Sequence, residues 1–264
     1  MIKVEDKIIE QETFGDGTLK CSNPILESTK AFITITWCYD SDAEIFTLWS
    51  LVKHIKDKHY NLPINLALPY IPHARQDRQV SGKLFTLKYF AELINRMEFS
   101  NVFVLDPHSD VSTALIDRVR LMYSPLLLPN DVVVMYPDAG AAKKYSKDYP
   151  NICTPIIGNK CRDESGKIIS YELLNFVEGT KKVVIRDDIC SYGGTFVAAA
   201  KSLKSRGVEE ITLIVSHCEN NILKGDVLNW IDNVITTDSI CTISHPQIEV
   251  KKRYREGAVY RVQD

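Results

Sequence analysis

The sequence has no apolar run that approaches the ~18 residues of a membrane-spanning helix, and residues 1–6 lack the basic and apolar regions of a signal peptide. Neither sign of charge prevails, because 32 lysines and arginines stand against 34 acidic residues, a formal net charge of −2. The charge composition therefore does not predict a broad basic surface that could bind a polyanionic nucleic acid. We expect a cytoplasmic protein that binds neither membranes nor nucleic acid.

The cysteines also lack a pattern. There are seven, an odd number, widely separated and without a C-x-x-C pair, which argues against a disulfide framework and against a zinc site. With 45% hydrophobic and 25% charged residues, the composition is that of a globular protein rather than a disordered or coiled-coil one. At 264 residues the chain is long enough for one large or two small domains.

What the sequence does have is a regular alternation of elements. Short β-branched and aliphatic runs predict buried strands at 31–37, 64–68, 101–105, 132–135, 182–185 and 211–215. Apolar residues with helical spacing predict helices at 44–55, 83–97, 139–147 and 195–206. This alternation indicates an α/β protein with parallel sheet covered by helices on both faces.

Turn-forming residues near 123–130 separate a predicted helix from a new strand. We therefore predict two domains, 1–122 and 123–264. Within the second domain, residues 157–170 form the longest stretch without apolar periodicity. They predict a long polar loop, a feature that is usually functional or disordered.

The strongest chemical signal is a segment in which an apolar strand leads into two acids, a glycine turn and a helix start at Thr195. Gly193 and Gly194 let the backbone approach a ligand, and the N–H groups that open the helix can bind phosphate oxygens. Thr195 can cap the helix or bind phosphate. The preceding Asp187 and Asp188 suit ribose hydroxyls. The alternative is an ordinary strand-to-helix turn with a solvated acid pair.

This segment resembles the phosphoribosyl diphosphate binding motif of the type I phosphoribosyltransferase fold. A second segment, residues 68–78 (LPYIPHARQDR), resembles the signature of ribose-phosphate pyrophosphokinases. Its chemistry is consistent with a nucleotide site, because Arg75 and Arg78 offer planar forks for a triphosphate and Gln76 can bind a base edge. A basic solvated loop is the alternative for these residues alone.

Four further segments resemble motifs of the same family and follow its order. Residues 14–17 (FGDG) resemble its adenine-binding segment, and residues 105–108 (LDPH) are similar to a motif whose histidine serves magnesium and ATP. Residues 136–144 (YPDAGAAKK) resemble a Pro-Asp-Ala-Gly-Gly motif at a helix start. Lys160 and Arg162 match the Lys-x-Arg pair of the family's flexible catalytic loop.

The resemblance implies two phosphoribosyltransferase-like domains, each a mainly parallel sheet flanked by helices, with ATP motifs in the first and ribose-phosphate motifs in the second. It implies an enzyme that uses Mg²⁺ to move the β,γ-diphosphate of ATP to the anomeric hydroxyl of ribose 5-phosphate, releasing AMP, and that forms at least a homodimer. Cations must cover the charge that moves in such a transfer. The implied roles are catalysis by Lys160, Arg162 and Arg75; ATP binding by Phe14, Asp16, Arg75, Gln76, Asp77 and His108; ribose-phosphate binding by Asp138, Asp187, Asp188, Ser191, Tyr192, Gly193, Gly194 and Thr195; and Mg²⁺ binding by His108 and Asp138.

The phosphate turn departs from the family, which usually has Asp-Thr where this chain has Ser191 and Tyr192. A tyrosine here would crowd a compact dianionic phosphate. A second acceptor therefore stays open: ADP-ribose, whose diphosphate carries less charge at the proximal phosphorus and whose base could stack on Tyr192. That acceptor is the one implied by a phage-type branch that serves NAD salvage. Harmless family variation is the other interpretation.

Two other functions compete with the enzyme. A non-catalytic regulatory relative would be expected to lose the loop cations or the metal histidine, yet Lys160, Arg162 and His108 are present. A phosphoribosyltransferase that consumes the diphosphate would leave residues 72–78 without a role. We therefore favour the diphosphotransferase.

Overall fold

The computed structural model describes residues 1–24, 26, 31–122, 124, 126–129, 132–146, 154–162 and 168–256, with the side chains of Arg162 and Ile168 excepted. The chain divides into two compact units, one made of residues 1–123 with the segment from 252 onward and the other of residues 124–251. In the described part of the chain, none of the helices has the length and apolar character needed to cross a bilayer. The functional division predicted at residues 122 and 123 stays a prediction.

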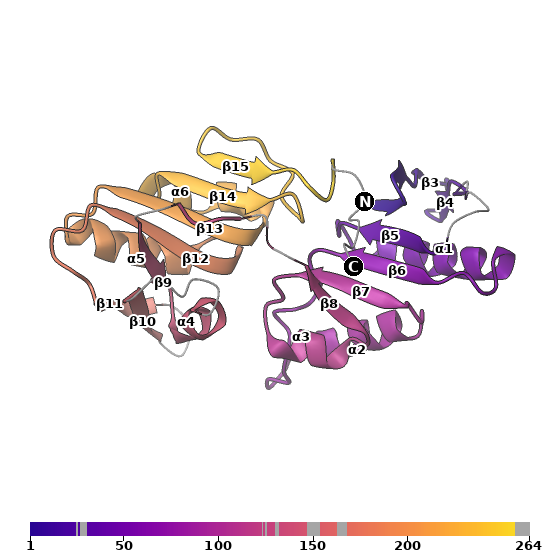
Figure 1. The fold of residues 1–264 in the computed structure, drawn as a ribbon, viewed down its shortest axis with the longest axis horizontal. Helices are drawn as coiled ribbons and strands as arrows, with labels where there is room; N and C mark the ends of the chain where they lie inside the picture. Colours follow the sequence, from indigo (N-terminus) through magenta and orange to yellow (C-terminus); the bar gives the residue numbers. More distant parts are fainter. Residues whose placement is uncertain are drawn as a thin grey trace. The chain divides into compact units, whose positions relative to one another are not determined.

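The first unit is built on a six-stranded sheet (Figure 1). Its order is β2 (Lys7–Ile8), β1 (Ile2–Val4), β5 (Ile33–Trp37), β6 (Ile64–Leu68), β7 (Asn101–Leu105) and β8 (Val119–Met122). Strands β5 to β8 are parallel, whereas β1 and β2 add an antiparallel edge. Four successive parallel strands require crossover connections, which helices supply.

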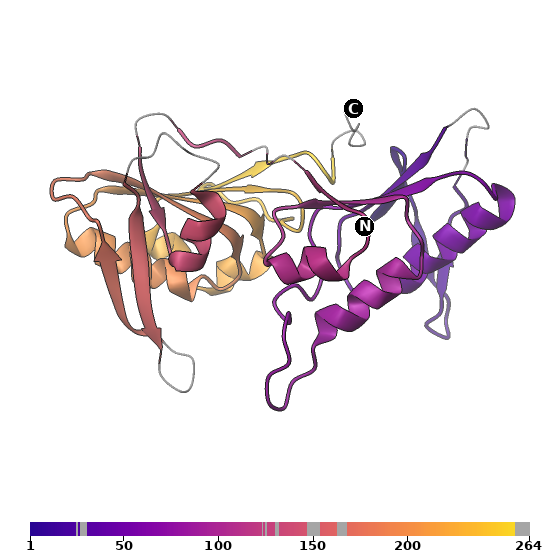
Figure 2. The ribbon, with the colours of Figure 1, turned by 60° about the horizontal axis from the view of Figure 1, so that its bottom comes forward.

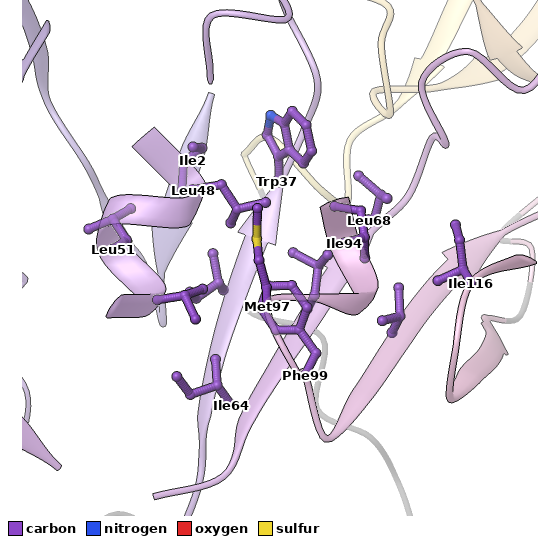
Figure 3. Close-up of a cluster of buried hydrophobic side chains, with 14 of the residues drawn as sticks. Ile2, Trp37, Leu48, Leu51, Ile64, Leu68, Ile94, Met97, Phe99 and Ile116 are labelled. Carbon is purple, nitrogen blue, oxygen red and sulfur yellow. The ribbon is translucent and has the colours of Figure 1, made fainter. Parts of the chain in front are cut away.

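Helices α1 (Glu44–Lys58) and α2 (Thr86–Asn95) bury their apolar faces on one side of this sheet. Figure 3 shows the resulting core, in which Trp37, Leu48 and Ile94 lie among other apolar side chains. The short helix α3 (Asp110–Leu115) follows β7. Side chains alternate along β7, since Val102 and Val104 face this core while Phe103 and Leu105 belong to a second cluster.

That second cluster includes Tyr254, from the segment that follows the second unit. Lys3 Nζ donates hydrogen bonds to the carbonyl oxygens of Tyr254, at 3.3 Å, and of Arg255. Arg255 Nη2 in turn donates to Asp40 Oδ1 at 2.6 Å. Residues 252–256 thus pack on the first unit, although they follow the second in sequence.

A separate two-stranded hairpin, β3 (Gln11–Thr13) and β4 (Leu19–Cys21), also belongs to the first unit. Thr47 of α1 donates a hydrogen bond to Gln11 Oε1 at 3.1 Å and lies 3.5 Å from Cys21 Sγ. These contacts hold the base of the hairpin against α1. Its tip contains Phe14 and Asp16.

The second unit has a seven-stranded sheet (Figure 1). Its order is β11 (Ile168–Leu174), β10 (Ile156–Arg162), β9 (Val133–Tyr136), β12 (Lys182–Cys190), β13 (Glu210–Cys218), β14 (Asn233–Thr237) and β15 (Ile248–Lys251). All neighbouring pairs are parallel except β10 and β11.

Helices cover both faces of this sheet. Val134 and Tyr136 pack with α4 (Ala139–Tyr145), whereas Met135, between them, packs on the side of α5 (Gly194–Ser205). The short helices η1 (Asn220–Lys224) and α6 (Val227–Trp230) cover the α5 side. The predicted fold class, two mainly parallel sheets each flanked by helices, is confirmed.

The predicted polar loop at 157–170 is wrong as a description of local structure. Its described residues belong to the antiparallel strands β10 and β11, which Figure 2 shows as a long hairpin. Residues 163–167 of that loop, and residue 147 of the predicted helix 139–147, lie outside the described residues. Lys160 therefore sits on a hydrogen-bonded strand, where it pairs in register with Tyr171.

Candidate functional site

The candidate residues of the second unit lie near the carboxyl ends of neighbouring parallel strands. Asp138 follows β9, Lys160 lies near the end of β10, and Asp187 and Asp188 lie near the end of β12. Because β9 pairs in parallel with both β10 and β12, these ends meet at one edge of the sheet. Ligands of open α/β sheets bind at such edges.

Asp138 links the start of α4 to the hairpin. Its Oδ1 accepts a hydrogen bond from the Ala141 N–H at 2.9 Å, so it caps the helix, and its Oδ2 accepts one from Lys160 Nζ at 2.6 Å. Burial acts to raise the pKa of Asp138, but the bonds from Lys160 and Ala141 outweigh it and lower that pKa. Asp138 is thus held as a carboxylate beside a cation.

Tyr171 makes a second contact between the hairpin and this loop. Its hydroxyl donates to the carbonyl oxygen of Pro137 at 2.9 Å. Gly158 provides the space, because a Cβ atom there would lie 2.0 Å from Tyr171 Oη and 2.6 Å from Pro137 O. Burial raises the pKa of Tyr171, and the charges of Asp138 and Asp187 raise it further. The phenol therefore stays protonated and keeps its hydrogen bond.

Asp187 and Asp188, near the end of β12, lie in different environments. Burial, followed by the charges of Asp188 and Asp138, raises the pKa of Asp187 to about 7. Asp188 is buried, with Lys144 Nζ of α4 at 3.5 Å from its Oδ2. Asp138 and Asp187 are thus close enough to interact, and one carboxylate carries an unusually high proton affinity.

Arg186, which precedes this acid pair, anchors α4 to the sheet. Its buried guanidinium lies 4.1 Å from the centre of the Tyr145 ring and donates from Nη2 to Ser216 Oγ at 3.1 Å. A cation held over an aromatic ring away from water contributes on the order of 2 kcal/mol. The contact therefore stabilises the helix that Asp138 caps.

The predicted phosphate turn joins β12 to α5. Gly193 precedes the helix with a φ of 74°, in the left-handed region, and a Cβ there would lie 1.9 Å from Val227 Cγ2. Around Gly194 nothing lies within 4 Å of an added Cβ, so the start of the helix is open. Ser191 Oγ donates to Glu219 Oε2 at 2.5 Å. The Tyr192 side chain is 55% exposed, so it can reach a ligand.

In the first unit, Asp77 and His108 follow the neighbouring parallel strands β6 and β7. The end of β7 contacts the loop that follows β6, since Leu105 N donates to Pro69 O at 3.1 Å. Burial acts to raise the pKa of Asp77, but the hydrogen bond from Arg78 Nε, at 3.0 Å, and the charges of Arg78 and His108 lower it. Asp77 and His108 therefore lie together. Arg75 and Gln76 are exposed.

Phe14 and Asp16 lie apart from these loops, at the tip of the β3–β4 hairpin. Phe14 is 54% exposed, and Asp16 Oδ1 accepts hydrogen bonds from the backbone N–H and the hydroxyl of Thr18 at 2.9 and 2.7 Å. Those bonds lower the pKa of Asp16. Thr18 thus shapes the turn.

Within each unit, the structure brings together some of the predicted site residues. Asp138, Lys160, Asp187 and Asp188 form one group, and Asp77 and His108 form another. The two predicted metal ligands belong to different units, His108 to the first and Asp138 to the second. Among the described residues, no group of three or more His, Cys, Asp or Glu side chains is arranged to hold a metal ion. The side chain of Arg162 lies outside them.

Sequence reasoning missed several residues that shape the surroundings of the candidate residues in the second unit. Lys144, Gly158, Tyr171 and Glu219 each contact a predicted residue or make room for one that does. Lys144 had a detectable signal, because it lies in the same motif as Asp138, six residues further along the chain. The others depend on strand pairing, which their own positions in the sequence do not reveal.

No protein-family model matches the sequence. Among curated proteins, the ribose-phosphate pyrophosphokinase of Marinomonas sp. (strain MWYL1) is 30% identical over 197 residues, which cover 69% of this chain and 61% of the relative. The ribose-phosphate pyrophosphokinase of Aquifex aeolicus (strain VF5) is 28% identical, covering 95% of this chain and 82% of the relative. The chain thus spans about three-fifths of the length of the first relative and four-fifths of the second.

A solved structure has the same fold. Phosphoribosylpyrophosphate synthetase from Mycobacterium smegmatis superposes with a TM-score of 0.74 at 20% sequence identity, covering 93% of this chain and 86% of that one. The match therefore extends over both units and their order along the chain. The structural match shows the fold, and the curated sequence relatives show that this chain belongs to the ribose-phosphate pyrophosphokinase family.

Proposed function

We propose that the chain is a Mg²⁺-dependent diphosphotransferase that moves the β,γ-diphosphate of ATP to the anomeric hydroxyl of ribose 5-phosphate and releases AMP. The observation that carries the proposal is the hydrogen bond from Lys160 to Asp138, whose charge also raises the pKa of Asp187. These side chains lie at the sheet edge that also carries the glycine turn into α5. The names of the relatives support the same reaction.

In this reaction the anomeric oxygen attacks the β-phosphorus and gives up its proton. The bond from that phosphorus to the oxygen bridging it to the α-phosphorus breaks, and AMP leaves with that oxygen. Positioning and charge neutralisation supply most of the catalysis in phosphoryl transfers. Lys160 and Arg162 would neutralise the transferring group, while Asp187 and Asp188 would hold the ribose hydroxyls.

The remaining roles divide between the two units. The turn from Ser191 to Thr195 would bind the 5′-phosphate through the N–H groups at the start of α5. Arg75, with its planar guanidinium, would bind the ATP phosphates. Further ATP contacts would come from the rest of the first unit's predicted set, Phe14, Asp16, Gln76, Asp77 and His108.

The residues present fit a magnesium ion. Three carboxylates, those of Asp138, Asp187 and Asp188, lie at neighbouring strand ends, and burial together with the charges of Asp188 and Asp138 raises the pKa of Asp187 to about 7. Magnesium is usually held by one or two carboxylates together with substrate phosphates. Asp138 would hold it in the second unit, and when bound it would neutralise phosphate charge; His108, in the first unit, stays a predicted ligand.

The test is ³¹P NMR of the purified chain with Mg-ATP and ribose 5-phosphate. We expect AMP together with a new anomeric diphosphate, and label from [β-³²P]ATP on the sugar. ADP would indicate an ordinary kinase, and absence of AMP would favour a non-catalytic relative. A parallel sample with ADP-ribose tests the other acceptor, which none of the relatives' names supports.

A further inference from the structure

His73 has none of the roles above, yet it begins the turn that carries two of the predicted ATP contacts. Its carbonyl oxygen accepts a hydrogen bond from the Gln76 N–H at 2.8 Å, which closes a turn over residues 73–76. We call residues 73–76 the arginine turn, because Arg75 lies within it. Ala74 is buried, whereas Arg75 and Gln76 are exposed. The arginine turn thus rests on the core through Ala74 and presents its two polar side chains to solvent.

The backbone of His73 has a conformation that depends on support from its surroundings. Its φ of 60° lies in the left-handed region, which residues other than glycine adopt infrequently, asparagine, aspartate and histidine more often than the rest. Residues in this region persist where the surrounding structure holds them. The direction in which the chain leaves His73 sets the place of Arg75, two residues later. The contacts of His73 therefore decide where the arginine turn presents its guanidinium.

Two other elements of the first unit hold the His73 side chain. Its Nε2 lies 3.0 Å from Oδ1 of Asp42, in the loop between β5 and α1. Its ring lies against that of Phe90 on α2, with 5.6 Å between the ring centres. An ionised carboxylate can only accept, so Nε2 carries the hydrogen of the bond to Asp42. The imidazole therefore joins the arginine turn to the loop after β5 and to α2.

The carboxylate that holds His73 is itself tied to the core. The Tyr39 hydroxyl donates a hydrogen bond to the same Oδ1 of Asp42 at 3.1 Å. Burial, followed by the hydrogen bond to Asp42 and its charge, raises the pKa of Tyr39 to about 12, so the hydroxyl keeps its hydrogen at neutral pH. The Tyr39 ring packs edge-on against the fully buried Trp37, with 5.8 Å between ring centres. Asp42 is thus an anchored partner for His73.

We propose that His73 is a positioning residue for ATP, whose contact with Asp42 holds the arginine turn in the conformation that binds the nucleotide. Apparent affinity falls with the fraction of the protein that has the binding-competent conformation. A contact that favours this conformation therefore strengthens binding without touching the nucleotide. This inference rests on the proposed function, because it takes Arg75 and Gln76 to bind ATP.

Isothermal titration of the full chain with α,β-methylene-ATP and Mg²⁺ tests the proposal without turnover, because a carbon replaces the bridging oxygen whose bond would break. His73→Gly removes the imidazole but tolerates the left-handed backbone. Asp42→Ala removes its partner and leaves the arginine turn unchanged in sequence. We expect each variant to bind the analogue about fivefold more weakly, equal to ~1 kcal/mol. The double variant should lose about the same factor and not its square, because both changes remove one contact.

Two controls separate positioning from a general effect on the fold. Asp42→Asn keeps a carbonyl oxygen that can accept from both donors, so it should retain the affinity for the analogue to within about twofold. Asp57→Ala removes an exposed carboxylate from the last turn of α1 and should change nothing. In every variant the affinity for ribose 5-phosphate should equal that of the wild type. Unchanged binding of the analogue by His73→Gly or Asp42→Ala, multiplied losses in the double variant, or an equal loss for ribose 5-phosphate would overturn the proposal.

Should His73→Gly fail to fold, His73→Asn takes its place. Asparagine also tolerates the left-handed backbone, and its shorter side chain does not reach Asp42, so the same loss is expected and wild-type affinity would overturn the proposal. A wild-type chain that does not bind the analogue would overturn it as well. Failure of the proposed function is distinguishable, because the wild type then forms no AMP while the pattern of analogue affinities remains. Failure of the inference alone leaves AMP formation intact.

Discussion

The two units hold their candidate residues by different means, although both place them after parallel strands. In the second unit opposite charges offset one another, with Lys160 on Asp138 and Lys144 near Asp188. In the first unit Asp77 is buried, whereas the neighbouring Arg75 and the distant Phe14 are exposed. Exposed side chains can be changed with little effect on folding. Substitutions should therefore separate binding from stability in the first unit and combine them in the second.

The largest effect is expected for Lys160→Ala, which would break the second unit's charge pairing. Removing one group that stabilises transition-state charge typically lowers kcat by about 10²–10³-fold. Steady-state AMP release measures this, with Lys181→Ala as the control because Lys181 forms an ion pair with Glu209 in which both side chains are exposed. An unchanged kcat would remove Lys160 from the catalytic group.

Gly158→Ala tests whether the hairpin is held by close packing. The added methyl would meet Tyr171 Oη and Pro137 O, which cannot both yield, so the free energy of unfolding should fall by about 1–3 kcal/mol. Urea denaturation measures the change. Gly15→Ala is the matched control, since nothing lies within 4 Å of its added Cβ. Equal free energies of unfolding for Gly158→Ala and the wild type would show that Tyr171 can move away from Gly158 with little loss of stability.

Phe14→Ala tests the first unit, where the change of an exposed residue should weaken ATP binding without lowering stability. Loss of a base-stacking ring costs about 1–3 kcal/mol of binding, so the KM for ATP should rise about tenfold, at the low end of that range. The free energy of unfolding should change by less than about 0.5 kcal/mol. Tyr60→Ala, which removes an aromatic side chain that is 90% exposed, should change neither quantity. A KM equal to that of the wild type would exclude Phe14 from the ATP site.

The smallest effect is expected for Asp40→Asn, which weakens the attachment of residues 252–256. The Asp40 side chain, which pairs with Arg255, is 47% exposed. Ion pairs this exposed contribute about 0–1 kcal/mol to the free energy of unfolding. Burial acts to raise the pKa of Asp40, but Arg255 lowers it. The ion pair therefore stabilises the folded chain above pH ~4, the pKa of Asp40 in the unfolded chain. This stabilisation is lost as the pH falls through the lower pKa that Asp40 has in the folded chain. Chemical denaturation of both proteins, with Asp57→Asn as control, should show the difference vanish in acid.

The sequence predicted the interior of each sheet well, and the reason is physical. Strands β6 and β7 have the predicted bounds, because central strands of a parallel sheet are buried on both faces and read as continuous apolar runs. The β10–β11 hairpin gives no such signal. Its polar residues are fixed by contacts that depend on tertiary structure, from Lys160 to Asp138 and from Tyr171 to Pro137.

The candidate site could be predicted where one continuous segment contains several of the residues that a phosphate site needs. The turn before α5 has its acids, glycines and helix start together, and the structure has the strand, turn and helix there. Glu219 lies far along the chain from Ser191 and reaches it only because β12 and β13 are neighbours. Pairings of this kind follow from strand order, which a single sequence does not specify.

The return of residues 252–256 to the first unit has a consequence for biosynthesis. The partners of Lys3 and the neighbour of Phe103 in its cluster emerge only after the whole second unit has been translated. At elongation rates of ~5–20 residues per second, this interval lasts on the order of ten seconds. During it the nascent chain lacks the Tyr254 side chain of this cluster, so the apolar face is incompletely covered and open to chaperones and to misassembly.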